Sequence, residues 1–187
     1  SSKNGLASAF RCYKKRIIFV SKNNMESRYN LRAWQNSDCQ MIYDWRMSPE
    51  VRSKSFNNQE FSYESHKSWF QKFMENKLSF GFILEVDNNP VAQIRFDKTK
   101  IEGYYNISIF TAPSNSGKGY GSRILSMACK DENLLKTAKY FVAEVFDDNI
   151  PSKKIFLKNG FEVTGETDVD GHHVLLFKRQ ALYQPGL

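Results

Sequence analysis

Cysteines and long apolar runs are both scarce in this sequence, and each shortage excludes a class of protein. The 3 cysteines, Cys12, Cys39 and Cys129, are widely spaced and odd in number, which fits neither a disulfide framework nor a set of metal ligands. We therefore expect no metal site, and the favoured location is a reducing cytoplasm. The longest apolar stretches, 17–20 and 174–177, are far too short to span a bilayer, so no membrane partner is expected.

Charge is not gathered into long runs of one sign either. The net charge is +7, but the 27 basic residues are scattered among 20 acidic ones. Nucleic-acid-binding proteins concentrate basic residues on one face, often with interleaved aromatic residues. We therefore expect no nucleic-acid partner. A basic surface also suits a ligand that carries several phosphates.

Length and composition predict one main domain. A chain of 187 residues with 41% hydrophobic residues can bury one good core. Residues 1–28 differ in composition from the rest and hold one candidate strand at 16–20. Whether this segment joins the fold or ends an upstream domain is open. The main domain is expected at 29–187.

Hydrophobic periodicity predicts a mixture of strands and helices. We expect strands at 30–34, 79–86, 91–96, 104–112, 140–146, 161–164 and 174–178, and helices at 38–47, 64–76, from 120 onward and at 151–158. Pro49 is expected to stop the first helix, Ser62 to cap the second and Gly160 to cap the last. His172 and His173 are expected in a turn before the last strand. Hairpins in the middle and alternation later in the chain fit a mixed α/β sheet.

The most informative segment is 107–125, where a strand runs into a glycine-rich loop that opens a helix. Gly117, Gly119 and Gly121 stand at every second position. Glycine lets the backbone come close to a bound group, and the amides of a helix start suit a pyrophosphate. The even spacing differs from the dinucleotide-binding fingerprint, and Ala112 stands where a P-loop needs glycine.

A second segment, 144–161, follows about 30 residues downstream, and the two segments together resemble the acetyl-CoA signature of the GNAT acetyltransferase superfamily. In the family's loop, a polar residue and two small residues correspond here to Ser116, Gly119 and Gly121. The positions that match the later motif are Asn149, Ser152, Phe156, Lys158 and Gly160-Phe161. The resemblance covers roughly residues 30–179.

This resemblance implies a fold and a co-substrate. The implied fold is α/β, with a central mixed, mostly antiparallel sheet of about seven strands flanked by about four helices. The co-substrate would be acetyl-CoA, with its pantetheine arm between the strands through Thr111 and Glu144 and its thioester carbonyl polarised by backbone amides near Thr111. The residues implied to bind it are Phe110, Thr111, Ala112, Ser116, Gly117, Lys118, Gly119, Tyr120, Gly121, Ser122, Asn149, Ser152, Phe156 and Lys158.

One departure from the family concerns proton transfer to the leaving group. The family often has Tyr at the position of Phe156, where it protonates the departing thiolate, and Phe cannot donate a proton. A thiol with a pKa of about 8.5 leaves tolerably without help, and Ser152, Cys129 and Tyr140 are possible substitutes. The attacking amine must also lose a proton, for which Glu144 and His66 are candidates.

The amino-terminal part of the domain, 42–70, resembles a narrower group, the nucleotide-sugar acetyltransferases of pseudaminic-acid synthesis. These enzymes acetylate UDP-linked 4-amino-4,6-dideoxy sugars. The resemblance implies that Arg46 and His66 shape the acceptor site, and Arg95 and Tyr105, on neighbouring strands, are candidates to line the same cleft.

Other acceptors stay open: the amino terminus of a protein, a polyamine or an antibiotic. Phe156 also keeps open a non-catalytic module that binds CoA or a metabolite. We expect direct transfer within a ternary complex, without an acyl-enzyme. A homodimer is a further open possibility.

Overall fold

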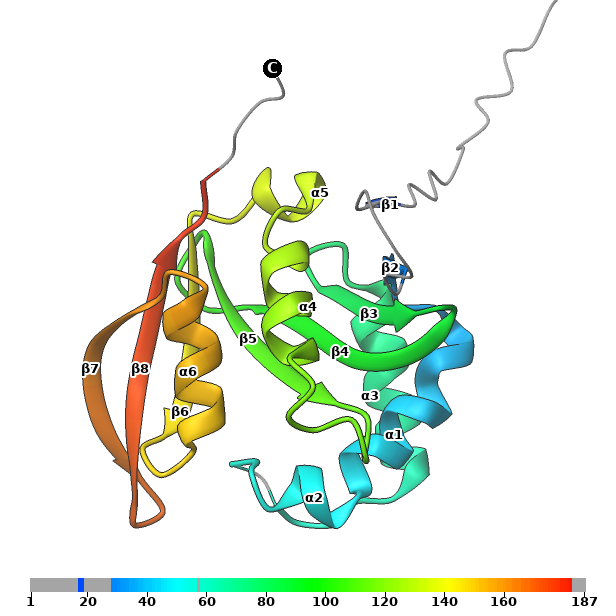
Figure 1. The fold of residues 1–187 in the computed structure, drawn as a ribbon, viewed down its shortest axis with the longest axis horizontal. Helices are drawn as coiled ribbons and strands as arrows, with labels where there is room; N and C mark the ends of the chain where they lie inside the picture. Colours follow the sequence, from blue (N-terminus) through cyan, green and yellow to red (C-terminus); the bar gives the residue numbers. More distant parts are fainter. Residues whose placement is uncertain (1–16, 19–27, 57, 183–187) are drawn as a thin grey trace, which may run out of the picture.

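The computed structural model describes residues 17–18, 28–56 and 58–182. This part of the chain forms one sheet of 8 strands in the order β1-β2-β3-β4-β5-β6-β8-β7 (Figure 1). All neighbouring strands are antiparallel except β5 and β6, which are parallel. The α/β fold with a mixed, mostly antiparallel sheet is confirmed. The eighth strand, β1, is only 2 residues long.

The predicted elements occur in the predicted order, with boundaries that differ by a few residues, and the described residues add three short helices that were not predicted. The strands are β1 (Ile17–Ile18), β2 (Tyr29–Ala33), β3 (Phe80–Val86), β4 (Asn89–Lys98), β5 (Tyr104–Thr111), β6 (Tyr140–Phe146), β7 (Glu162–Val169) and β8 (His172–Gln180). The helices are η1 (Asn36–Asp38), α1 (Cys39–Met47), α2 (Pro49–Arg52), α3 (Tyr63–Glu75), α4 (Tyr120–Ala128), α5 (Glu132–Leu135) and α6 (Ile150–Lys158). The four helices α1, α3, α4 and α6 each have 9 residues or more.

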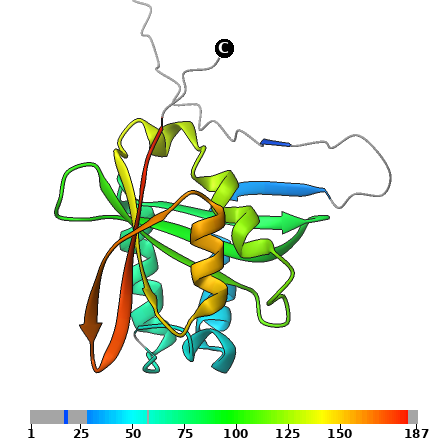
Figure 2. The same ribbon diagram turned by 60° about the vertical axis from the view of Figure 1, so that its left-hand side comes forward.

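The sheet has a hydrophobic core on each face. Side chains alternate between the faces of a strand, so β4 sends Ala92, Ile94 and Phe96 into a large core with α4 and α6. A smaller core on the opposite face joins Trp34 and Ile83 to α1 and α3. Figures 1 and 2 show α4 and α6 on one side of the sheet and α3 on the other.

Several local predictions are confirmed by the backbone. Ser62 caps α3 by accepting a hydrogen bond from the Ser65 amide at 3.2 Å. Gly160 has a φ of 76°, the left-handed conformation that ends a helix. The β3–β4 hairpin turns at Asp87 and Asn88, with φ values of 49° and 66°, a conformation that these two residue types tolerate.

The end of the first helix before Pro49 is confirmed, because α1 stops at Met47. Pro49 also begins the 4-residue helix α2, where its fixed φ and missing amide hydrogen are tolerated. One local prediction is wrong, because His172 and His173 lie inside β8 rather than in a turn. The turn instead falls at Asp170 and Gly171, both with positive φ.

The amino-terminal segment was expected to hold one strand at 16–20. Ile17–Ile18 forms β1 and pairs with β2, opposite Leu31 and Asn30. The remainder of 1–27 lies outside the described residues, so its place in the domain organisation stays a prediction. Among the described helices, none has the length and apolar character needed to cross a membrane.

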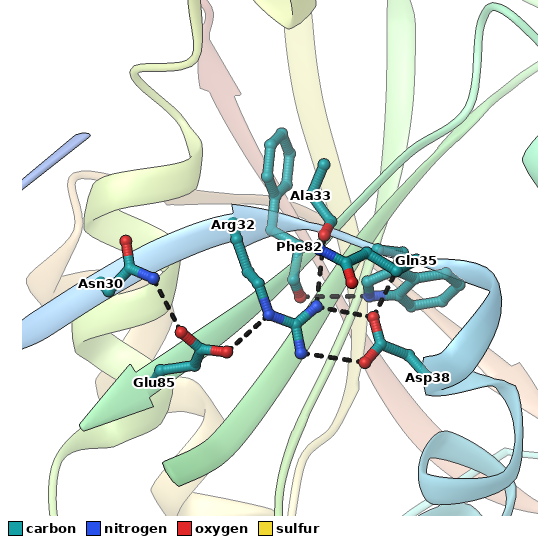
Figure 3. Close-up of polar contacts among 8 residues, drawn as sticks. Asn30, Arg32, Ala33, Gln35, Asp38, Phe82 and Glu85 are labelled. Carbon is teal, nitrogen blue, oxygen red and sulfur yellow. Dashed lines mark hydrogen bonds and ion pairs between the residues drawn. The ribbon is translucent and has the colours of Figure 1, made fainter. Parts of the chain in front are cut away.

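A buried ion-pair network fixes β2 to β3 and to the start of α1 (Figure 3). The guanidinium of Arg32 donates to both carboxylate oxygens of Asp38 at 2.6 and 2.9 Å, and to Glu85 at 2.6 Å. Asp38 also accepts from the Gln35 amide at 2.7 Å, and Asn30 donates to Glu85 at 2.7 Å. Burial lowers the pKa of Arg32, but these hydrogen bonds outweigh it, so its pKa is raised. The network therefore holds Arg32 charged.

Candidate active site

A cleft opens where the two parallel strands separate. Strands β5 and β6 pair only at Tyr104–Tyr140, Tyr105–Phe141 and Asn106–Val142, and beyond that point they diverge (Figure 1). A cavity of about 740 Å³ lies there, bounded by the ends of both strands, the glycine loop, α6 and the region of α2. We call it the central cleft. Ten of the residues expected to bind acetyl-CoA line it: Phe110, Thr111, Ser116, Gly117, Gly119, Tyr120, Gly121, Asn149, Ser152 and Phe156.

The glycine loop presents the start of α4 to this cleft. Gly119 is the N-cap of α4 with a φ of 80°, and no side chain in the described part of the chain caps the helix. The first helical hydrogen bond runs from the Arg123 amide to the Gly119 carbonyl at 3.1 Å, so the amides that precede Arg123 have no partner within the helix. Gly121 serves a different purpose, because an added Cβ would lie 2.8 Å from Cδ1 of Ile155 on α6. The loop thus combines an open helix start with close packing of α4 on α6.

Four residues from the acetyl-CoA set do not line the cleft. Ala112 is buried, and Ser122 accepts a hydrogen bond from the Asn159 side chain at 3.0 Å. Lys118 is exposed and donates to Asn115 at 2.9 Å. Lys158 lies exposed in the last turn of α6. Any contact from these four to a ligand would be made at the rim or through the backbone.

Helix α6 begins at the cleft wall. The Asn149 side chain caps it by accepting from the Ser152 amide at 3.2 Å, which is a structural use of Asn149. Phe156 is only 3% exposed and packs on Phe161 and Phe177, with ring centroids 5.1 and 5.6 Å away. The aromatic ring at this position therefore serves both the core and the cleft.

The candidates for proton transfer lie in different parts of the structure. Glu144 lines the central cleft and is exposed, and Ser152 lines it too. Cys129 lies in the core and is only 3% exposed. This burial raises the pKa of its thiol to about 12. Tyr140 packs against Tyr104, with ring centroids 4.8 Å apart, at the end where β5 and β6 are paired. Of these four residues, only Glu144 and Ser152 are within the cleft lining.

A second cavity of about 360 Å³ lies between the sheet and helices α1 and α3, and we call it the side pocket. It is lined by Trp34, Ile42, Arg46, Phe61, Ser65, His66, Trp69, Gln93, Arg95, Ser108 and Phe110. Its sheet wall consists of two cross-strand pairs, Gln93–Phe110 and Arg95–Ser108 on β4 and β5. These residues share one face of the sheet because paired and alternate residues point the same way. Arg46, Arg95, Ser108 and Phe110 also line the central cleft, so the two cavities adjoin.

Two arginines give the side pocket its positive charge. Burial lowers the pKa of Arg46, and the charges of Arg95 and Arg52 lower it further. Burial also lowers the pKa of Arg95, although Asp97 opposes this, with its Oδ2 atom 3.0 Å from Arg95 Nε. The Arg95 guanidinium carbon lies 4.7 Å from the centroid of the Trp69 ring. Arg46 and Arg95, predicted acceptor-site residues, are therefore brought together.

His66 lines the side pocket inside an aromatic cluster. It is 4% exposed, and its Nε2 lies 3.0 Å from the Cys39 carbonyl oxygen. Because a carbonyl only accepts, that nitrogen donates and Nδ1 carries no proton in the neutral ring. The rings of Tyr43 and Trp69 both lie 5.4 Å from the His66 ring. Burial lowers the pKa of His66, and the charge of Arg95 acts in the same direction.

The lowered pKa of His66 predicts a pH dependence of stability. Between its ordinary pKa of about 6.5 and the lower value in the folded state, the unfolded chain binds more protons. The stability that neutral His66 contributes is therefore fully present above about pH 6.5, and it is lost as the pH falls from there through the folded-state value. Urea unfolding at pH 7.5 and pH 5 measures this loss. The loss is expected to shrink in His66→Gln, and an unchanged pH dependence in that variant would contradict the assignment.

Tyr105 does not reach either cavity, so the suggestion that it lines the acceptor cleft is wrong. It is 1% exposed within the large core, and its hydroxyl lies 2.9 Å from Thr137 Oγ1. Arg95 and Tyr105 lie on neighbouring strands but on opposite faces, because Tyr105 is paired with Lys98, an odd number of residues from Arg95.

Sequence reasoning missed several residues of the two cavities. Gln93 and Trp34 line the side pocket, and Lys54, Phe56 and Phe146 line the central cleft. The rings of Phe56 and Phe146 have centroids 4.2 Å apart, which joins the segment after α2 to the end of β6. One of these residues could have been found from the sequence, because Gln93 is a polar residue within an otherwise apolar strand segment. Among the described residues, no group of three or more His, Cys, Asp or Glu side chains could hold a metal ion.

Comparison with known proteins identifies the family. The family profile described as "Acetyltransferase (GNAT) domain" matches residues 28–162, which include the glycine loop and α6. The chain belongs to the GNAT acetyltransferase family. Its activity class is therefore acyl transfer. No curated protein sequence gives a significant match.

Solved structures with this GNAT fold include several acetyltransferases. A spermidine N-acetyltransferase from Vibrio cholerae in complex with CoA and spermine has a TM-score of 0.72 and 17% identity, over 82% of this chain and 95% of that one. YncA, a putative acetyltransferase from Salmonella typhimurium with acetyl-CoA, has a TM-score of 0.68 and 16% identity, over 85% and 97%. RimL, the ribosomal L7/L12 α-N-protein acetyltransferase, has a TM-score of 0.70 and 16% identity, over 94% and 99%. These neighbours give no support to the narrower resemblance to nucleotide-sugar acetyltransferases.

Proposed function

We propose that the protein transfers the acetyl group of acetyl-CoA to the amine of a small acceptor, with CoA in the central cleft and the acceptor in the side pocket. The observation that carries this proposal is the uncapped start of α4, which opens into the cleft between β5 and β6. Unpartnered amides at a helix start bind phosphate groups. CoA and acetyl-CoA are bound by the spermidine acetyltransferase and YncA, respectively, which supports the same use here.

Transfer is direct in this proposal. The amine attacks the thioester carbonyl carbon, a C–N bond forms, the C–S bond breaks, and CoA leaves as the thiolate. Glu50 and Glu144 are the carboxylates in the described lining of the cleft. Glu144 is our candidate to take the amine proton, because it lies on β6 beside the gap between the strands, whereas Glu50 accepts a hydrogen bond from the Ser114 amide. Phe156 cannot protonate the thiolate. An acetylated protein trapped by rapid-mixing mass spectrometry would contradict direct transfer.

Three kinds of acceptor are compatible with this chemistry. A nucleotide-linked 4-amino-4,6-dideoxy sugar follows from the narrower sequence resemblance, and Arg46, Arg95 and His66 in the side pocket favour it. Polyamines and protein amino termini follow from the printed activities of the structural neighbours. Arginine binds phosphate and carboxylate groups in a bidentate manner, so the pocket offers more to an anionic acceptor than to a polyamine.

The test is thiol release from acetyl-CoA with a panel of amines. The panel contains UDP-4-amino-4,6-dideoxy sugars, polyamines, aminoglycosides and short peptides. We expect release with at least one of these classes, and Glu144→Gln should lower kcat by about 100-fold, the contribution typical of a general base. Binding of acetyl-CoA without release for any amine would contradict the enzymatic proposal and favour a binding module.

A further inference from the structure

The side pocket holds positive charge, and the described residues of its lining include no carboxylate. Its two charged residues, Arg46 and Arg95, lie close enough for the charge of Arg95 to lower the pKa of Arg46. Asp97 compensates part of the Arg95 charge but does not line the pocket. Two like charges held together in a partly buried site repel each other. A bound anion would relieve this repulsion, whereas a polyamine would increase it.

Gln93 adds an independent sign of a ligand. Its side chain lines the side pocket and is only 1% exposed, and neither its amide nitrogen nor its amide oxygen has a hydrogen-bond partner among the residues that the structure describes. Leaving a buried polar group unpaired costs about 1–3 kcal/mol. A ligand with a hydroxyl or amide group can satisfy both atoms, because the side chain donates and accepts.

The side chains of Gln93 and Arg95 face the same region of the pocket. They are two residues apart on β4, so their side chains leave the same face of the sheet. Phe110 and Ser108, their partners on β5, also line the central cleft. A molecule held by Gln93 and Arg95 therefore lies beside the cleft in which the thioester is proposed to sit.

We propose that the acceptor is a small amine that carries a carboxylate or phosphate group, bound by Arg46 and Arg95, and a neighbouring hydroxyl or amide group, bound by Gln93. This inference rests on the proposed function, because it names the substrate class of that site. It makes Gln93 and Arg95 the residues that select the acceptor. It also separates this protein from the spermidine acetyltransferase that shares its fold.

Matched pairs of amines test the inference by binding. Calorimetry on the CoA-loaded protein measures the affinity for each member of two pairs, glucosamine 6-phosphate with glucosamine and β-alanine with its amide. The affinity for spermidine is measured in the same way and compared with these four. A charge-assisted hydrogen bond contributes about 1.5–3 kcal/mol, so the anionic member of a pair should bind about 10- to 100-fold more tightly. The pair with the larger ratio shows whether the anion is a phosphate or a carboxylate.

Variants assign the preference to the pocket. Arg95→Gln should reduce the ratio within each pair to near one, and Gln93→Leu should weaken binding of both sugars. Arg28→Gln removes the same charge from an exposed position outside both cavities and should keep the ratio. Thermal unfolding midpoints check that each variant is folded.

The outcomes separate the two proposals. If the unmodified protein does not bind CoA, the proposed function is wrong. If CoA binds, three results would each overturn the acceptor class: equal affinities within both pairs, no binding of either anionic probe, or tighter binding of spermidine. A ratio that survives in Arg95→Gln would also overturn it.

Discussion

Gly119→Val is expected to lower the affinity for acetyl-CoA by about 10- to 100-fold. Gly119 has a φ of 80° at the N-cap of α4, a conformation that costs a residue with a side chain about 1–3 kcal/mol and is worst for a β-branched one. An added Cβ would meet nothing within 4 Å, so the cost arises from the backbone and not from packing. The loop should therefore lose the conformation in which its amides face the cleft.

Gly171→Val is a matched control for this variant. Gly171 has a φ of 78°, and an added Cβ there would also meet nothing within 4 Å. It lies in the turn between β7 and β8 and does not line the cleft. Both variants should lose similar stability in thermal unfolding, but only Gly119→Val should lose CoA affinity in calorimetry. Equal affinities for CoA in the two variants would show that the glycine loop is not part of the binding site.

Asp38→Ala is expected to lower the free energy of unfolding by about 3–5 kcal/mol. Asp38 is paired in a bidentate manner with Arg32, and the two side chains are only 6% and 18% exposed. Removing Asp38 leaves Arg32 with Glu85 as its remaining carboxylate partner, and two guanidinium N–H groups lose their acceptor in a largely buried site. The variant also loses the hydrogen bond from the Gln35 amide to Asp38. Urea unfolding measures the difference.

An exposed ion pair supplies the control for Asp38→Ala. Arg52 Nη1 lies 2.6 Å from Glu60, the same distance as the shorter Arg32–Asp38 contact, but the Glu60 side chain is 74% exposed. Exposed pairs contribute about 0–1 kcal/mol, so Glu60→Ala should have a small effect. If the two variants lose equal stability, burial is not the reason for the importance of the Arg32 network.

The sequence predicted most of the fold because its signals are local. Strand β6 was placed at its observed limits, 140–146, since its apolar residues are bounded by polar ones. The short helix α5 was missed, because 4 residues give no readable period. Strand β7 extends to Val169 although its residues are mostly exposed and polar. Its length follows from its pairing with β8, and an exposed strand of this kind shows no hydrophobic pattern in the sequence from which its end could be predicted.

The candidate site was only partly predictable for a similar reason. The glycine loop is one continuous segment, so its residues could be found together. The side pocket assembles Arg46, His66 and Gln93 from α1, α3 and β4, together with Trp34 from the connection after β2. Only the fold brings these residues within reach of one another. Tyr105 shows the limit: its strand was predicted, but the face on which it lies depends on a register that the sequence does not reveal.

The divergence of β5 from β6 creates two open strand edges in the middle of a sheet. Beyond Asn106 and Val142, the backbone groups of the two strands that face each other have no partner strand among the described residues. Unpaired strand edges attract any extended chain that can complete their hydrogen bonds. The pantetheine arm of acetyl-CoA is linear and contains amide groups, so it can take the place of the missing strand neighbour. In this role the substrate would complete the architecture of the protein that acts on it.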